Sequence, residues 1–274
     1  MNFNQNKHLG KILGTILNHD IPVFLQQNKN ITTWILNDYI EQKIMEYKTL
    51  PFLKNYIYEG EKYNFASCIS INEELVHTRP NRDKVINNND IVKVDLVISN
   101  KNKDLVDSAR SFYYINNITK IDKKKHEIFL FVEKFLIDFF NIQVLKQNYR
   151  DIYYVLLDWI ENFKNFRNLF NKKFKQNINV IPNLCGHFIG KKLHMNPLLY
   201  FDEENIKNTQ RHKNLKINDK FCLEPVLIVG NNTDIKTYPN KFKITSHNTD
   251  NNISFHYENT YFFNNKWEIK VLTI

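Results

Sequence analysis

The chain has 274 residues and carries 38 Lys and Arg against 29 Asp and Glu, a formal net charge of +9. Hydrophobic residues make up 42% of it, which excludes wholesale disorder and is enough for one large domain with a sizeable core. The sequence has no run of about 18 apolar residues and no apolar leader, and its three cysteines are too widely spaced for a disulfide framework. We therefore expect a reduced, cytoplasmic protein without a membrane segment.

The basic charge does not by itself identify a nucleic-acid-binding protein. The lysines are scattered along the chain, and neither an arginine-rich helix nor zinc-finger spacing accompanies them. Compositional drift in an AT-rich genome, with a solvated basic surface, explains the charge most simply. Weak affinity for the RNA surface of a ribosome is the alternative.

Two amphipathic helices are expected at the start of the chain. The apolar residues of the first fall on one helix face, namely Leu9, Ile12, Leu13, Ile16 and Leu17. The second is expected to begin after Thr32 and to turn inward Leu36, Tyr39, Ile40 and Ile44. From about Ala66 to Tyr114 the pattern changes to short β-type runs separated by Asn and Asp.

Helical spacing returns over residues 126–140 and 151–163, and the segment 163–177 is either an insertion or an extension of the second of these helices. Strand-like segments then cover residues 221–229, 253–263 and 267–273. Two helices followed by strands, twice over, suggest a single domain, 1–274, built from two related halves, about 1–118 and 119–274. No sequence repeat accompanies this topological prediction.

Two aspartates oppose each other in a predicted hairpin. Asp95 lies in one strand-like segment and Asp107 in the next, with a polar turn over residues 99–103 between them. In a hairpin centred on Lys101 the two carboxylates lie directly across from each other, and a bulge shifts this by one position. Opposed carboxylates repel unless a cation or a shared proton compensates. The pair therefore predicts a metal site, or else one aspartate points to solvent at a strand end.

Two histidines and two glutamates with apolar neighbours follow later in the chain. His187 and His194 lie in a segment that contains two glycines, which permit close backbone approach, and imidazole suits a first-row transition metal. Glu224 lies within an otherwise apolar strand, where a carboxylate needs a partner, and Glu258 is a second such case. Each of these signals is weak when taken alone.

Together these residues resemble the methionine aminopeptidases, metallopeptidases of the pita-bread fold. The resemblance runs from about residue 57 to the C-terminus. Residues 68–77 are similar to the stretch that leads into the family's first active-site histidine, and the Gly-His-x-Ile-Gly, Glu-Pro and Tyr-Glu-x-Thr motifs follow in order. The family's five metal ligands match Asp95, Asp107, His187, Glu224 and Glu258. Without a Cys/His-rich extension or a long helical insertion, the chain resembles the compact bacterial type I form.

The resemblance implies an α+β protein of the pita-bread fold, with two pseudo-symmetric halves, each of two helices and antiparallel strands, around a central dinuclear metal site. It implies two divalent ions, of Co, Mn, Fe or Zn, bridged by Asp107 and Glu258. Asp95 is expected on one ion, and His187 and Glu224 on the other. The implied activity is removal of the initiator methionine from nascent polypeptides, with small second residues preferred. We expect a cytoplasmic monomer, and transient contact with the ribosome stays open.

The resemblance also implies roles for individual side chains. Glu224 takes a proton from the attacking water and passes it to the leaving amine. His194 donates to the carbonyl oxygen as negative charge develops, and His77 positions the scissile nitrogen, so both histidines bind substrate as well. The candidates for the apolar methionine pocket are Tyr63, Cys68, Leu193 and Phe242. Ordinary core packing is the alternative for the last two.

Several positions depart from the family pattern. Thr78 and Phe188 stand where the family usually has glycine, and Asn259 stands where histidine is common. Met195 and Asn196 replace acidic residues. These departures leave pocket shape and turnover open. Two other functions remain: a proline-directed aminopeptidase of the same fold, which usually carries an additional N-terminal domain, and a catalytically inactive protein that binds RNA or ribosomes.

Overall fold

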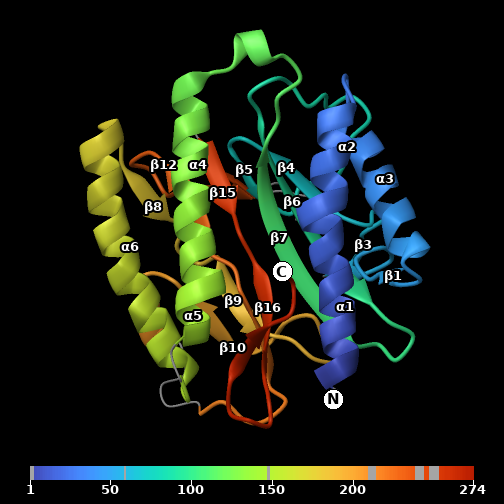
Figure 1. The fold of residues 1–274 in the computed structure, drawn as a ribbon, viewed down its shortest axis with the longest axis vertical. Helices are drawn as coiled ribbons and strands as arrows, with labels where there is room; N and C mark the ends of the chain where they lie inside the picture. The colour runs from blue at the N-terminus through green and yellow to red at the C-terminus, as the bar shows by residue number, and fades with distance from the viewer. Residues whose placement is uncertain (1–2, 59, 147–148, 209–213, 238–243, 247–252) are drawn as a thin grey trace.

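The computed structural model describes residues 3–58, 60–146, 149–208, 214–237, 244–246 and 253–274. The helices are α1 (Phe3–Thr15), α2 (Ile21–Gln27), α3 (Thr33–Glu46), α4 (Lys123–Ile137), α5 (Val144–Lys146) and α6 (Ile152–Phe174). In Figure 1, α1 to α3 lie on one side of the view and α4 to α6 on the other, with β7, β15 and β16 visible between them. Within the described residues, none of the helices combines the length and the apolar character that crossing a membrane requires.

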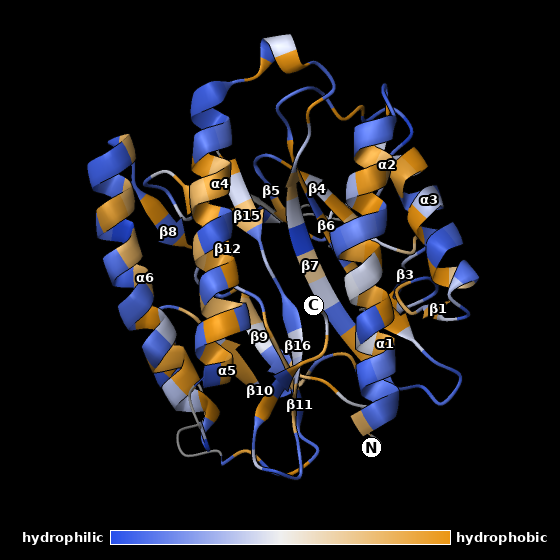
Figure 2. Cartoon of the chain, viewed as in Figure 1, coloured by the Kyte–Doolittle hydropathy of each residue, from blue (hydrophilic) through white to orange (hydrophobic). Residues whose placement is uncertain are grey.

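The helix ends follow from local chemistry. Thr32 precedes α3, and its side-chain oxygen accepts a hydrogen bond from the backbone N–H of Ile35 at 3.2 Å, which confirms the expected start of this helix. Asp151 caps α6 in the same way, by accepting from the backbone N–H of Tyr153. Since α6 continues to Phe174, the segment after residue 163 extends the helix. Figure 2 shows that the long helices carry both apolar and polar stripes, which is typical of helices that cover a core on one face.

An antiparallel sheet dominates the N-terminal half. Its strands, with the short ones beside them, are β1 (Leu50–Pro51), β2 (Ile57–Tyr58), β3 (Glu61–Lys62), β4 (Cys68–Ile71), β5 (Glu74–Val76), β6 (Ile91–Ser99) and β7 (Leu105–Tyr113). β7 pairs along the whole of β6, and β1 and β4 pair with β6 as well. β6 is buried at almost every position. Helix α1 packs against this sheet, and β6 is also in contact with β15 of the C-terminal half.

The hairpin of β6 and β7 corrects one expectation. Asp107 pairs with Val97 and not with Asp95, so the two aspartates share a face but stand diagonally, two positions apart. The reason lies in the turn. The side-chain oxygen of Asn100 accepts hydrogen bonds from two backbone N–H groups of the turn, at 2.9 and 3.0 Å, and this shifts the centre of the turn one residue beyond Lys101.

The C-terminal half is built from short strands. They are β8 (Ile178–Val180), β9 (Cys185–Phe188), β10 (Met195–Tyr200), β11 (Lys220–Leu223), β12 (Val226–Val229), β13 (Ile235–Thr237), β14 (Ile244–Ser246), β15 (Ile253–His256), β16 (Asn259–Phe263) and β17 (Ile269–Val271). One sheet has the order β10-β9-β11-β16-β17, a second β15-β12-β8, and a third joins β13 and β14 to β5 of the other half. The expected strand-like segments are therefore confirmed, but two of them are interrupted.

Both interruptions fall at glutamates. The ladder between β11 and β16 and the ladder between β12 and β15 share one register, which places Glu224 opposite Glu258 in the gap between them. Glu258 instead pairs with Ala109 of β7, through backbone hydrogen bonds of 3.0 and 3.4 Å. We call the pairing of β7 with residues 258–260 the seam, because it joins the strands of the two halves.

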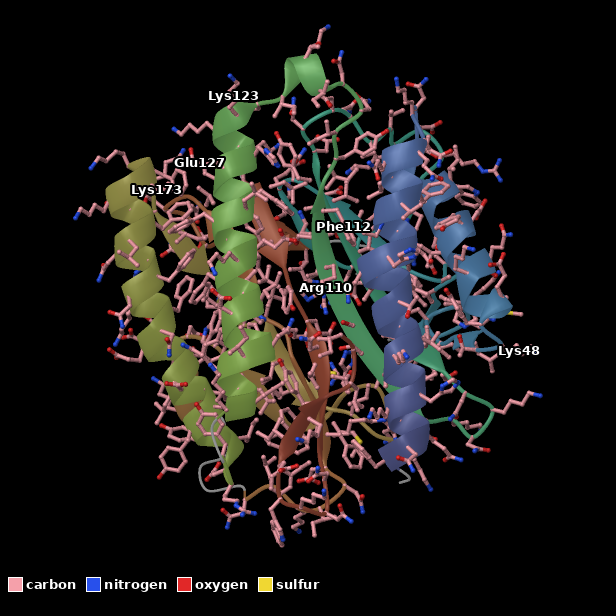
Figure 3. All side chains as sticks on the ribbon, in the orientation of Figure 1. Lys48, Arg110, Phe112, Lys123, Glu127 and Lys173 are labelled. Atoms are coloured by element: carbon pink, nitrogen blue, oxygen red, sulfur yellow. The ribbon has the colours of Figure 1, made fainter. Side chains whose placement is uncertain are left out.

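A buried arginine holds the seam together. Arg110, labelled between α4 and α1 in Figure 3, donates to the carbonyl oxygens of Glu258 at 2.5 Å and Thr273 at 2.9 Å. It also donates to the side chain of Asn259 at 2.7 Å and stacks over the ring of Tyr257. Since these partners come from the C-terminal half, the cation of β7 fixes the backbone on which Glu258 stands.

Candidate metal centre

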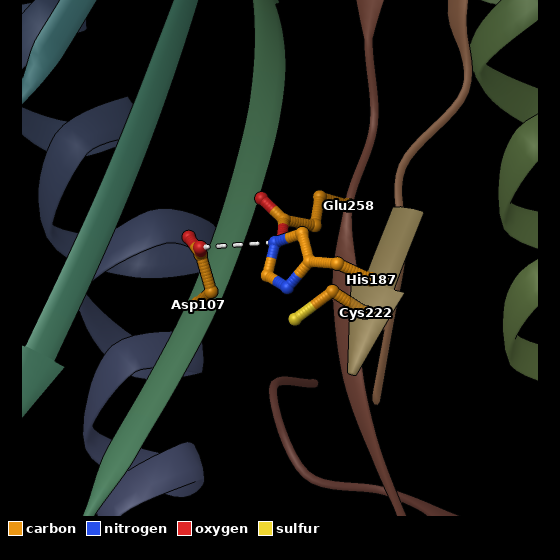
Figure 4. Close-up of side chains that lie close together, drawn as sticks. All are labelled: Asp107, His187, Cys222 and Glu258. Atoms are coloured by element: carbon orange, nitrogen blue, oxygen red, sulfur yellow. Dashed lines mark ion pairs between the residues drawn. The ribbon is translucent and has the colours of Figure 1, made fainter. Parts of the chain in front are cut away.

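The five candidate ligands come from five separate strand regions that meet near the seam. Asp95 lies in β6, Asp107 in β7 and His187 in β9, while Glu224 and Glu258 occupy the two strand interruptions. Figure 4 shows Asp107, His187 and Glu258 turned towards one another, with Cys222 beside them. The segments that supply them are far apart in sequence, and the tertiary fold alone brings them together.

The donor atoms of Asp107, His187, Glu224 and Glu258 are within reach of shared cations, whereas Asp95 belongs to a neighbouring donor group. Nε2 of His187 lies 3.3 Å from Oε1 of Glu224 and 3.9 Å from Oδ2 of Asp107. Donor atoms within 4.8 Å of one another form three groups, which are Asp107 with His187, Cys222 and Glu258; Glu224 with His256 and Glu258; and Asp95 with Cys68 and His77. The first two groups share Glu258.

The carboxyl groups at the centre are electrostatically frustrated. Burial raises the pKa of each of the four, and the charges of neighbouring carboxylates raise the pKa of Asp107, Glu224 and Glu258 further. Among the described residues, Oδ1 of Asp107 and Oε1 of Glu258 are buried without a hydrogen-bond partner. Buried acceptors of this kind are costly unless a cation or a proton satisfies them, and so the donor set fits a divalent ion.

The tautomer of His187 also favours a cation. Its Nδ1 lies 3.1 Å from the carbonyl oxygen of Phe188, which can only accept, so Nδ1 carries the hydrogen and Nε2 presents a lone pair to the carboxylates. Burial lowers the pKa of His187 to about 3, which keeps the ring neutral. A histidine that donates one ring nitrogen to a backbone carbonyl and offers the other is typical of metal ligands.

A glycine brings His187 to this place. Gly186 precedes it in β9, and a Cβ atom there would lie 2.3 Å from the carbonyl oxygen of Cys222 in the neighbouring strand β11. Only glycine permits so close an approach of the two backbones. The Gly-His pair therefore combines a packing requirement with a ligand.

The comparisons with known proteins decide the family. The sequence matches metallopeptidase family M24 over residues 14–264. The chain belongs to this family. A methionine aminopeptidase of Clostridium acetobutylicum is 28% identical over 260 residues, which cover 93% of this chain and 89% of that relative.

Solved structures agree on the fold of this M24 metallopeptidase. The methionine aminopeptidase of Thermotoga maritima superposes with a TM-score of 0.75 at 19% identity, covering 97% of this chain and 94% of that one. That of Rickettsia prowazekii gives a TM-score of 0.74 at 20% identity, with 99% and 96% covered. This likeness, together with the family match, confirms the expected α+β pita-bread fold.

Three of the four residues expected to line the methionine pocket of this M24 metallopeptidase lie together. Tyr63, Cys68 and Leu193 belong to one buried apolar cluster that also contains Cys222, next to the candidate ligands. The hydroxyl of Tyr63 donates to the carbonyl oxygen of Ser67 at 2.8 Å, which leaves its ring as an apolar wall. Phe242 lies outside the described residues.

The two further histidines flank the centre. His77 lies with Cys68 and Asp95 in one donor group, and its backbone adopts a left-handed conformation with φ of 60°, which is uncommon outside glycine. The ring of His194 meets the ring of His187 edge-on, with centroids 4.6 Å apart. His194 is otherwise exposed, so it lies at the outer side of the ligand set.

Sequence reasoning missed His256. Its ring nitrogen Nε2 is buried 3.5 Å from Oε2 of Glu224, yet the residue was not among the expected site residues. Strand alternation supplies the signal that would have found it, since residues two apart in an extended segment share a face, and His256 lies two residues before Glu258. Cys222, the other addition, keeps its proton at neutral pH because burial raises the pKa of its thiol.

Proposed function

We propose that this metallopeptidase is a methionine aminopeptidase that removes the initiator methionine from nascent polypeptides, acting as a monomer in the cytoplasm. The convergence of Asp95, Asp107, His187, Glu224 and Glu258 beside a buried apolar cluster is the observation that carries the proposal. The names of its relatives support the same activity.

The five candidate ligands would hold two divalent ions of Co, Mn, Fe or Zn. One imidazole and four carboxylates form an oxygen-rich set suited to such ions and unlike a closed, cysteine-rich structural zinc site. When bound, ions of this kind act as Lewis acids and lower the pKa of coordinated water. Asp107 and Glu258 would both hold these ions, because the seam brings their strands together.

Protein side chains would carry the proton transfers. Glu224 is the proposed general base and later the acid, because its carboxylate lies within the ligand set, 3.3 Å from Nε2 of His187, where it would meet the attacking water. His194, at the outer side, would donate to the developing negative charge on the carbonyl oxygen, and His77 would hold the scissile nitrogen. Both roles need a substrate that enters from the side of the exposed His194.

The apolar cluster suggests how methionine would be selected. Tyr63, Cys68 and Leu193 offer a wall of ring, sulfur and methyl groups that matches an unbranched thioether side chain. Since the ligands lie directly beside this wall, the second substrate residue has little room. We therefore propose a preference for small second residues such as Ala, Gly and Ser.

One assay separates the proposal from its alternatives. Metal-stripped protein is given Co, Mn, Fe or Zn in turn, and release of the first residue is measured from Met-Ala-Ser, Met-Asn-Ser and Xaa-Pro peptides. We expect fast cleavage of Met-Ala-Ser and cleavage of Met-Asn-Ser at least 100-fold slower, since about 3 kcal/mol of steric and desolvation penalty gives this factor. Preference for Xaa-Pro would instead identify a proline-directed enzyme, and no cleavage with any metal an inactive binding protein.

A further inference from the structure

A histidine outside the expected ligand set faces the metal centre. His256 ends β15, and its backbone is fixed from both sides by Ser111 of β7, whose hydroxyl accepts from the N–H of His256 and donates to its carbonyl oxygen, each at 3.0 Å. The side chain is 2% exposed. Its direction is therefore set by the same strand, β7, that carries Asp107.

The carboxylate of Glu224 lies between two imidazoles. Nε2 of His187 is 3.3 Å from Oε1, and Nε2 of His256 is 3.5 Å from Oε2. The nitrogen of His256 is fully buried and has no hydrogen-bond partner among the described residues. Donor atoms of His256, Glu224 and Glu258 all lie within 4.8 Å of one another.

This arrangement is unfavourable without a cation. With a lone pair on Nε2 the ring repels the carboxylate, and with a hydrogen there it still makes no hydrogen bond to the oxygen 3.5 Å away. An ion about 2.0–2.2 Å from both a nitrogen and an oxygen ligand spans separations of up to about 4 Å, which includes the one observed.

We propose that His256 is a sixth protein ligand of the centre, and that it coordinates through Nε2 the ion held by Glu224 and Glu258. The proposal rests on the proposed dinuclear centre and adds a second imidazole to its one histidine. Imidazole ligands favour Zn, Fe and other borderline ions over Mn, whereas carboxylate ligands bind Mn as readily as they bind those ions. The residue would therefore shift the metal preference of the enzyme away from Mn.

X-ray absorption on untagged, stoichiometrically zinc-loaded protein tests this, because outer-shell scattering counts coordinated imidazoles. We expect two imidazoles in the dinuclear centre of the unaltered protein. His256→Gln should leave one, as should His187→Gln, whereas the matched variant His194→Gln should keep two. By calorimetry, His256→Gln should weaken Zn binding at least about tenfold, and Mn binding by a clearly smaller factor.

The outcomes are distinct. A single imidazole in the unaltered protein overturns the sixth ligand without any need for a variant, and so does an imidazole count unchanged in His256→Gln. If the unaltered protein binds two ions and cleaves Met-Ala-Ser under either result, the proposed function stands and only the role of His256 fails. Failure of the unaltered protein to bind divalent ions overturns both.

Discussion

Glu224 occupies a strand interruption, where its backbone has no partner in the strand ladder. Its carboxylate faces the candidate metal centre and can bind an ion or transfer a proton. Replacement by Gln keeps the size of the side chain but removes the basic oxygen and weakens the metal site. We expect kcat on Met-Ala-Ser to fall at least about 100-fold, the scale typical of lost general acid–base catalysis. Glu73→Gln, in the exposed turn before β5, is the control and should be unaffected. Near-normal turnover in Glu224→Gln would assign the proton transfer to another group.

A second residue, remote from this chemistry, makes stability depend on pH. Lys220 in β11 is 2% exposed, and its ammonium donates to the side chain of Asn6 at 2.7 Å and to the carbonyl oxygen of Leu105. Burial lowers the pKa of Lys220 to about 8, from 10.5. Between these values the folded protein binds fewer protons than the unfolded one, so the free energy of unfolding rises with pH in this window.

The comparison with Lys220→Met isolates this effect. From pH 8 to pH 10 the unaltered protein should gain about 2–3 kcal/mol of unfolding free energy relative to the variant, measured by urea titration. The loss of hydrogen bonds in the variant changes the difference in unfolding free energy by the same amount at every pH. It therefore does not affect the slope with pH. A difference that stays flat across this range would show that Lys220 is not held in a depressed state.

At the scale of elements, α1 packs on the C-terminal segment through two glycines. A Cβ atom on Gly10 would lie 2.4 Å from the carbonyl oxygen of Leu272, whereas one on Gly14 would lie 2.9 Å from that of Ile274. Alanine normally stabilises a helix relative to glycine by about 1 kcal/mol. Here the clash reverses the sign, and Gly10→Ala should lower the free energy of unfolding by about 1–3 kcal/mol.

Gly14→Ala is the matched comparison for this helix. It makes the same change one turn further along, with more clearance, and so it should cost less than Gly10→Ala in the same urea titration. Equal stability of the two variants, or stabilisation by both, would contradict the prediction. It would mean that α1 and the C-terminal segment can move apart to accommodate a methyl group at little cost.

Elements with a strong local signal could be predicted from the sequence. The start of α3 follows from the capping chemistry of Thr32. For α6 the sequence predicted the helix over 151–163 and left residues 163–177 open, and the structure shows that the apolar stripe runs on through Phe170 and Phe174. The register of the β6–β7 hairpin could not, because the side chain of Asn100 decides it within the turn. One residue of shift in the turn moved Asp107 by two positions relative to Asp95.

The residues of the candidate site likewise include some that the sequence predicted and others that it did not. Motifs indicated the five candidate ligands because their residue types and order are recognisable. His256 belongs to no such motif. Its spacing from Glu258 indicates a shared strand face, but the meeting of β15 with β7 and β12 is what brings it opposite Glu224. Which faces of distant strands meet is a property of tertiary structure, and sequence spacing does not report it.

For the molecule as a whole, the metal ions should act as part of the core. We expect up to two divalent ions per chain, complete loss of activity with chelators, and a lower melting temperature after their removal. At an ion concentration of about 100 times Kd, each bound ion adds about 2.7 kcal/mol, or roughly 5–10 °C for a chain of this size. Elemental analysis, calorimetric titration and thermal scans measure these quantities, and full activity in metal-free protein would end the two-metal proposal.

The seam has a consequence for the order in which the chain folds. Contacts such as that between Ser108 and Glu258 join residues 150 positions apart, so they close a long loop and form late, after local helices and hairpins. The complete set of candidate ligands forms only when the halves dock, because Asp95 and Asp107 come from one half and the remaining ligands from the other. The binding of both metal ions would therefore mark the final docking step during refolding. A chain stalled before that step would contain most of its secondary structure but would have no enzymatic activity.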